Sequence, residues 1–130
     1  MIGMADWVLD ASAVLALMRA GAGAAQVVSA LPASLVASVN AGEVVGRLIR
    51  EGVEAESARL MMIELGCPIA PIDADLGLRA GMLATTPAAQ GLSLGDRCCL
   101  ALAEREGLTA LTADPSWSGL GPPVKIAMIR

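Results

Sequence analysis

SLGDRCCLALAEREGLTALT, residues 93–112, is the stretch of the chain that decides its fold class. Its first part carries apolar residues at helical spacing over 93–106, and Gly107 is typical of a residue that ends a helix. The apolar run 108–112 that follows is typical of a short buried strand. A helix that leads directly into a buried strand predicts a unit of an α/β fold.

The same alternation of short apolar runs and longer helical patterns extends outward in both directions. It predicts strands at 7–10, 35–37, 69–72 and 124–129, and helices at 12–19, 24–30, 40–50, 53–65 and 74–84. Apolar strands that alternate with helices favour a parallel sheet covered on both faces. We therefore expect one domain over residues 1–130, a three-layer α/β/α sandwich with a central parallel sheet of about five strands.

Composition excludes several classes of site. The chain of 130 residues has no His, which rules out a Ser-His-Asp triad and a His-based zinc site. Its three Cys lack the spacing of a disulfide scaffold or zinc site and suit a reducing compartment. Without Phe or Tyr the core must be aliphatic, and we expect Met61, Met62 and Met82 to fill it, with a patch that pairs with another subunit as the alternative.

Nothing in the sequence predicts a membrane span or a signal peptide. The uncharged stretch 20–42 is interrupted by Pro32 and by scattered polar residues, and the N-terminal residues include Asp6 without a basic segment. We expect a cytoplasmic protein.

Four acidic residues occur where strands end or helices begin. Asp10 ends the first predicted strand, Asp114 follows the strand 108–112, and Glu43 and Asp96 fall in the first turns of the helices 40–50 and 93–106. In a parallel sheet these positions share one edge, where ligands bind. Four carboxylates gathered there repel one another unless a cation neutralises them.

Each acid also has a structural explanation, which the sequence leaves open. Asp10 could cap a helix, and Asp114-Pro115 is a turn signal. Asn40 with Glu43, and Ser93 with Asp96, resemble capping boxes.

Oxygen ligands without His or Cys select Mg²⁺ or Mn²⁺, and an ion held by carboxylates can promote phosphodiester hydrolysis. The formal net charge of −4 argues against a nucleic-acid partner unless bound metal reverses the local potential.

Four segments, in order, resemble the successive motifs of PIN domains and, more narrowly, of VapC-type toxins from bacterial toxin–antitoxin pairs. They are VLDASA (8–13), SVNAGEV (38–44), LGDRCCLALA (94–103) and LTADPSW (111–117). The resemblance implies a Mg²⁺- or Mn²⁺-dependent endoribonuclease that acts on RNA such as tRNA or rRNA. It also implies a homodimer and a cognate antitoxin protein as partner.

The resemblance also implies roles for individual residues. Asp10, Glu43, Asp96 and Asp114 match the family's catalytic, metal-binding acids. Supporting roles fall to Ser12, Asn40, Thr112 and Ser116, and many relatives carry a further acid at the position of Ser116, which leaves open whether one or two ions bind. The candidate RNA contacts are Arg19, Arg47, Arg50 and Arg97.

Several alternatives stay open at this stage. An ion pair between Glu43 and Arg47 competes with RNA contact, and Trp117 either stacks on a base or covers the edge of the core. A catalytically silent PIN-like binding module is a second interpretation of the whole chain. A receiver-type phospho-acceptor domain that uses Asp73 and Lys125 is a third, but the motifs expected around such residues are missing.

Overall fold

The computed structural model describes residues 5–121 and 124–129, and a five-stranded sheet with all strands parallel runs through its centre. The strand order is β3-β2-β1-β4-β5. The strands are β1 (Trp7–Leu9), β2 (Ser34–Ala37), β3 (Ile69–Ala70), β4 (Thr109–Thr112) and β5 (Lys125–Met128). The expected parallel sheet is confirmed; β3 is shorter than expected because Pro71 has no N–H for the ladder.

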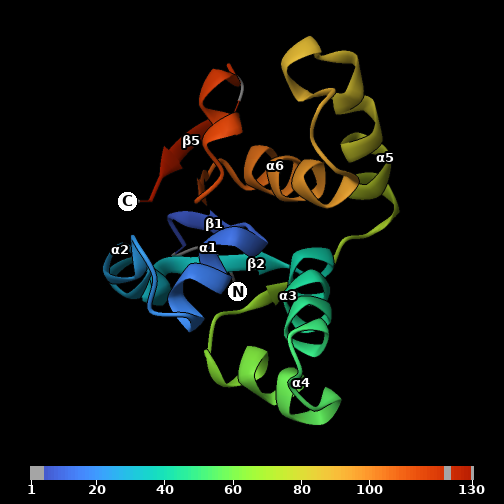
Figure 1. The fold of residues 1–130 in the computed structure, drawn as a ribbon. Helices are drawn as coiled ribbons and strands as arrows, with labels where there is room; N and C mark the ends of the chain where they lie inside the picture. The colour runs from blue at the N-terminus through green and yellow to red at the C-terminus, as the bar shows by residue number, and fades with distance from the viewer. Residues whose placement is uncertain (1–4, 122–123, 130) are drawn as a thin grey trace.

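Helices cover both faces of the sheet and complete a three-layer α/β/α sandwich (Figure 1). The helices α5 (Ala74–Met82) and α6 (Leu94–Glu106) pack on one face. The other face carries α1 (Ala11–Met18), α2 (Ala24–Ala30), α3 (Ser38–Arg50) and α4 (Ala55–Glu64). Short 3₁₀ turns follow at Leu31–Ala33, Leu83–Thr85, Pro87–Ala89 and Pro115–Gly119. No helix in the described residues is long and apolar enough to cross a membrane.

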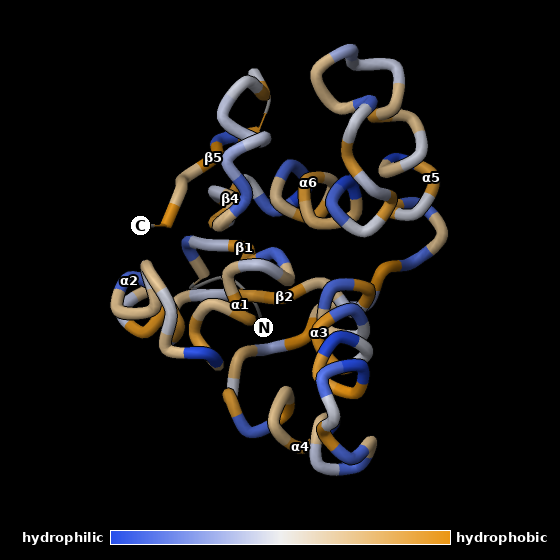
Figure 2. Tube along the Cα trace, in the orientation of Figure 1, coloured by the Kyte–Doolittle hydropathy of each residue, from blue (hydrophilic) through white to orange (hydrophobic). Residues whose placement is uncertain are grey.

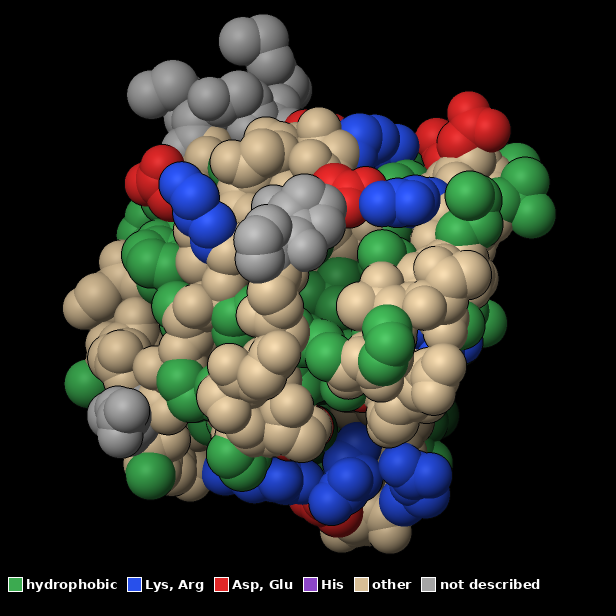
Figure 3. Space-filling model, turned by 90° about the horizontal axis from the view of Figure 1, so that it is seen from above, with side chains coloured by type: hydrophobic (Ala, Val, Ile, Leu, Met, Phe, Trp, Pro, Cys, Tyr) green, Lys and Arg blue, Asp and Glu red, His purple; other side chains and the backbone are tan. Residues whose placement is uncertain are grey.

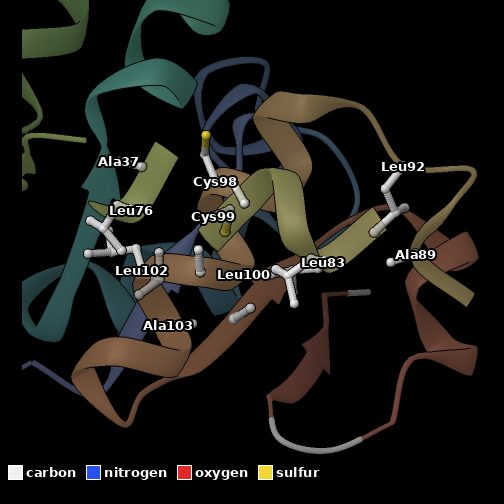
Figure 4. Packing of buried hydrophobic residues seen from close by; sticks show 14 of the residues in the cluster. Ala37, Leu76, Leu83, Ala89, Leu92, Cys98, Cys99, Leu100, Leu102 and Ala103 are labelled. Atoms are coloured by element: carbon white, nitrogen blue, oxygen red, sulfur yellow. The ribbon is translucent and has the colours of Figure 1, made fainter. Parts of the chain in front are cut away.

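The side chains of each central strand alternate between the two cores. Val8 belongs to the cluster under α5 and α6, whereas its neighbour Leu9 belongs to the cluster under α1 to α4. Figure 4 shows residues of α6, including Cys99 and Leu102, packed with Leu76 and Leu83 in the first of these clusters. Trp117 is fully buried there, so it covers the core and has no face free for a base.

Two expectations about helices were wrong. α3 begins at Ser38, two residues before Asn40, so Glu43 lies in its second turn and makes no capping box with Asn40. Hydrophilic and hydrophobic residues interleave along α3, as a helix with one buried face requires (Figure 2). Of the three methionines expected in the core only Met62 is buried, because Met61 and Met82 lie on outward faces of their helices and are 38% and 60% exposed.

Candidate active site

The four acids predicted from the sequence line one hollow of about 630 Å³, which we call the acidic hollow. The lining residues are Asp10, Ala11, Ser12, Leu15, Glu43, Gly46, Arg47, Arg50, Asp96 and Asp114. Asp10 directly follows β1 and Asp114 lies two residues after β4, while Glu43 and Asp96 come from α3 and α6. The acidic hollow therefore lies at the carboxyl edge of the parallel sheet, where the fold predicts a ligand site.

A second hollow, of about 440 Å³, lies against α2 and is lined by Trp7, Ala25, Gln26, Ser29, Ala30, Leu111 and Ala127. It presents no carboxylate and none of the acids predicted from the sequence.

Asp10 is the buried centre of the acidic hollow, with 3% of its surface exposed. It caps α1 by accepting a hydrogen bond from the Ala13 N–H at 2.9 Å. The Ser12 hydroxyl donates to Oδ1 at 2.7 Å, and the Thr112 hydroxyl donates to Oδ2 at 2.5 Å. Ser12 and Thr112 therefore hold this carboxylate in one orientation, Ser12 from the first turn of α1 and Thr112 from the last residue of β4.

Burial raises the pKa of Asp10 from 3.8 to about 6, against the opposing effect of its hydrogen bonds and with a contribution from the negative charge of Asp96. The negative charges of these acids also act on the buried thiol of Cys99. Burial raises the pKa of this thiol well above its ordinary value, and Asp10, Asp96 and Glu43 raise it further. The charges of Asp10, Asp96 and Glu43 thus all act on the same buried thiol.

Glu43 is held by a contact between α3 and α6. The Nδ2 amide of the buried Asn40 donates to Glu43 Oε1 at 2.8 Å and to the Gly95 carbonyl at 3.0 Å. Asn40 therefore links the helix that carries Glu43 to the helix that carries Asp96.

Asp96 and Asp114 make the local bonds that their structural explanation predicted. Asp96 Oδ2 accepts from the Ser93 N–H at 3.1 Å in a capping box, and Asp114 Oδ1 accepts from the Ser116 N–H at 2.9 Å. These roles do not compete with metal binding, because Glu43, Asp96 and Asp114 each keep a second oxygen that bonds to none of the described residues.

The donors fit a hard divalent cation in kind, because all four are carboxylates. Their arrangement is open: within residues 5–121 and 124–129 no three acidic, Cys or His side chains surround a common point closely enough to hold one ion. Hydrogen bonds hold Asp10 and Glu43 in place, so Asp96 and Asp114 would have to turn toward them for the acids to share a metal.

The predicted basic residues divide into two groups. Arg47 and Arg50 line the acidic hollow, whereas Arg19 and Arg97 do not. Arg47 does not pair with Glu43: its Nε donates to Glu51 at 3.0 Å, and Arg19 bonds the same carboxylate. Arg97 donates to the Leu92 carbonyl at 3.2 Å. Figure 3 shows basic side chains gathered along the lower margin of that view, with acidic atoms beside them.

Two residues of the site neighbourhood, Gly95 and Glu51, were missed from the sequence. A glycine in the first turn of a helix gives no signal unless its tertiary neighbour is known. Glu51 lies four residues after Arg47, a spacing that predicts an ion pair on a helix face and could have revealed it.

Comparison with known proteins gives a consistent result. The toxin VapC20 of Mycobacterium tuberculosis, described as cleaving the sarcin–ricin loop, is similar in structure with a TM-score of 0.75 and 21% identity, over 89% of this chain and 95% of that one. VapBC2 of Rickettsia felis, bound to a promoter DNA fragment, gives 0.72 and 15% over 95% and 98%. A toxin–antitoxin complex of Klebsiella pneumoniae gives 0.70 and 21% over 92% and 95%.

No curated protein sequence matches the chain. The PIN domain family profile matches residues 7–121, which include all four acids of the acidic hollow. The receiver-type alternative is thereby removed, in agreement with Lys125 lying at the first residue of β5 and Asp73 capping α5 outside the hollow. The chain belongs to the PIN domain family.

Proposed function

We propose that the chain is a metal-dependent endoribonuclease, the toxin of a type II toxin–antitoxin pair. The observation that carries the proposal is the convergence of Asp10, Glu43, Asp96 and Asp114 on one hollow in a PIN domain. The structural relatives described as toxins agree with it. Residues 1–130 would act as a single PIN-like domain in the bacterial cytoplasm.

In this proposal the four carboxylates would hold Mg²⁺ or Mn²⁺, and the bound ion would supply an activated water and neutralise charge on the phosphodiester. Ser12 and Thr112 keep Asp10 fixed, which reduces the reorganisation needed for binding. Arg47 and Arg50 at the rim bind RNA phosphates and offset the repulsion between the acids and RNA. Arg19, Arg97 and Ser116 contribute more remotely, since they lie outside the lining of the hollow.

We also propose a cognate antitoxin as protein partner and a homodimer as the working form. Several apolar side chains of α3 and α4 are exposed and available for such contacts, namely Ile49, Leu60, Met61 and Ile63. Light scattering of the purified chain tests the dimer, and co-purification with the product of a neighbouring small gene tests the antitoxin.

The direct test is cleavage of total bacterial RNA by the purified protein with Mn²⁺, with EDTA, and with an Asp96→Asn variant. Asn at position 96 can still accept from the Ser93 N–H, so the capping box does not depend on the charge. Asp75→Asn is the matched control, because Asp75 occupies the first turn of α5 as Asp96 does in α6 but lies outside the acidic hollow.

We expect discrete fragments that need both Mn²⁺ and Asp96, with full cleavage by Asp75→Asn. Cleavage that survives EDTA or the loss of Asp96 would contradict the proposal. A folded protein that binds antitoxin but cuts no RNA would favour the silent binding module, which the Ser116 departure keeps open.

A further inference from the structure

Gly95, the second residue of α6, lies directly against the carboxylate of Glu43. A Cβ atom built on Gly95 would lie 2.6 Å from both carboxylate oxygens of Glu43 and 2.7 Å from its Cδ. Non-bonded atoms do not approach this closely. The space that a side chain at position 95 would fill is thus already taken by the end of another side chain.

The carboxylate is also fastened in that place. Asn40 is fully buried. Its Nδ2 group donates one hydrogen bond to Glu43 Oε1 and a second to the carbonyl of Gly95 itself. A flipped amide would set its oxygen against two acceptors, so this orientation is the one that the two neighbours require. Glu43, Asn40 and Gly95 therefore form one unit across the contact between α3 and α6.

The contact at Gly95 differs from that of other helical glycines. At Gly42 and Gly46 of α3, and at Gly77 and Gly81 of α5, an added methyl group would meet no atom of the described residues within 4 Å beyond its own helix backbone. A helical glycine costs about 1 kcal/mol relative to alanine. Helix packing alone does not account for the glycine at position 95, because the atoms that fill its space belong to the Glu43 carboxylate and not to the α3 backbone.

We propose that Gly95 is a positioning residue of the active site, which leaves room for the Glu43 carboxylate to lie against α6 beside Asp96. Asn40 fastens that carboxylate from the α3 side. The role in metal binding rests on the proposed function, whereas the placement of Glu43 by Gly95 does not.

The test is Gly95→Ala, with Gly81→Ala as the matched control. The atoms in the way are the end of a flexible side chain, so Gly95→Ala should displace the Glu43 carboxylate without unfolding the protein. The first readout is the Asn40 side-chain amide signal in a ¹⁵N-correlated NMR spectrum without metal. We expect it to shift in Gly95→Ala, where the bond to Glu43 is lost, and to stay in place in Gly81→Ala.

The second readout is Mn²⁺ affinity by calorimetry. We expect Gly95→Ala to weaken it by about 10-fold or more, the range found when groups that orient metal ligands are changed. Gly81→Ala should bind as the wild type does. An unchanged Asn40 signal in Gly95→Ala overturns the placement of Glu43, and a shifted signal with wild-type Mn²⁺ affinity overturns the role in metal binding. A wild type that binds Mn²⁺ but cuts no RNA would defeat the ribonuclease proposal and leave both readouts valid.

Discussion

At the scale of the residue, the burial of the Asp10 carboxylate lowers the stability of the fold at neutral pH. Its pKa is raised from 3.8 to about 6, chiefly by burial. Between these two values the native state holds more protons than the unfolded state, so the free energy of unfolding falls as pH rises through that window. Above about pH 6 the charged carboxylate costs the fold about 3 kcal/mol.

Asp10→Asn should therefore stabilise the metal-free protein at neutral pH while it abolishes RNA cleavage. The Asn oxygen can still accept the Ala13 N–H, and the burial of charge is removed. We expect the free energy of unfolding in EDTA to exceed that of the wild type by about 1–3 kcal/mol near pH 8. The gain should disappear near pH 4. Urea unfolding at both pH values measures it, and a variant less stable than the wild type near pH 8 would contradict the argument.

Thr112→Val tests the hydrogen bond that stabilises the charged Asp10 carboxylate and so reduces the destabilisation caused by its burial. The Thr112 hydroxyl donates to Asp10 Oδ2 and accepts from the Asp114 N–H at 3.0 Å, and Val keeps the shape but removes both bonds. We expect a loss of about 1–3 kcal/mol that is larger near pH 8 than near pH 4, because the bond favours the charged carboxylate. Thr109→Val in the same strand is the control, since no described residue bonds to its hydroxyl. Equal losses at both pH values would mean that Thr112 serves packing alone.

At the scale of the element, the sequence predicts the sheet and every helix, but it misplaces the start of α3. Ser38 and Asn40 are residue types that cap helices, and taking Asn40 as the cap placed the start two residues late. In the structure both side chains serve distant partners: Ser38 accepts from the Ile72 N–H at 3.1 Å, and Asn40 bonds Gly95 of α6. A capping signal and a tertiary contact look alike in a single sequence, and only the fold separates them.

The places of Asp10 and Asp114 could be predicted from the sequence, whereas the role of Gly95 could not. Asp10 and Asp114 follow strands whose apolar runs are visible in the sequence, so topology alone gathers them. Gly95 matters through its contact with Glu43, 52 positions earlier in the chain, and no local pattern encodes that contact.

α3 also carries the two arginines that line the acidic hollow, Arg47 and Arg50. Of the two, Arg50 is better suited to a test of RNA binding. Arg47 is engaged by Glu51, whereas Arg50 is exposed and forms no ion pair within the described residues. We expect Arg50→Ala to weaken RNA binding in EDTA and to lower the slope of log affinity against log salt by about 1.

Arg59→Ala is the matched control for this measurement, because Arg59 is exposed on α4, pairs with Glu56 and lies outside the acidic hollow. Fluorescence anisotropy with labelled RNA at several salt concentrations gives both slopes. Equal effects of the two substitutions would indicate that RNA affinity depends only on the net charge of the chain and not on the position of Arg50.

At the scale of the whole molecule, the fold tolerates a wide change of sequence. A core with no Phe or Tyr gives the same architecture as relatives that are 15% to 21% identical. What the architecture demands is apolar strands buried on both faces, which Val, Leu and Ala supply here. The four acids of the acidic hollow lie together at one edge of this sheet.

A divalent ion should therefore act as a stabiliser of the entire fold. Mn²⁺ that binds only the native state should raise the free energy of unfolding by RT ln(1 + [Mn²⁺]/Kd), about 2.7 kcal/mol at 100 times the Kd. Thermal unfolding over a series of Mn²⁺ concentrations measures this gain. The gain should be retained in Asp75→Asn and reduced in Asp96→Asn, because only the second substitution removes a carboxylate of the acidic hollow. Equal stabilisation of both variants would mean that the ion binds elsewhere, and the acids would then serve as the caps and turn residues that their local hydrogen bonds already make them.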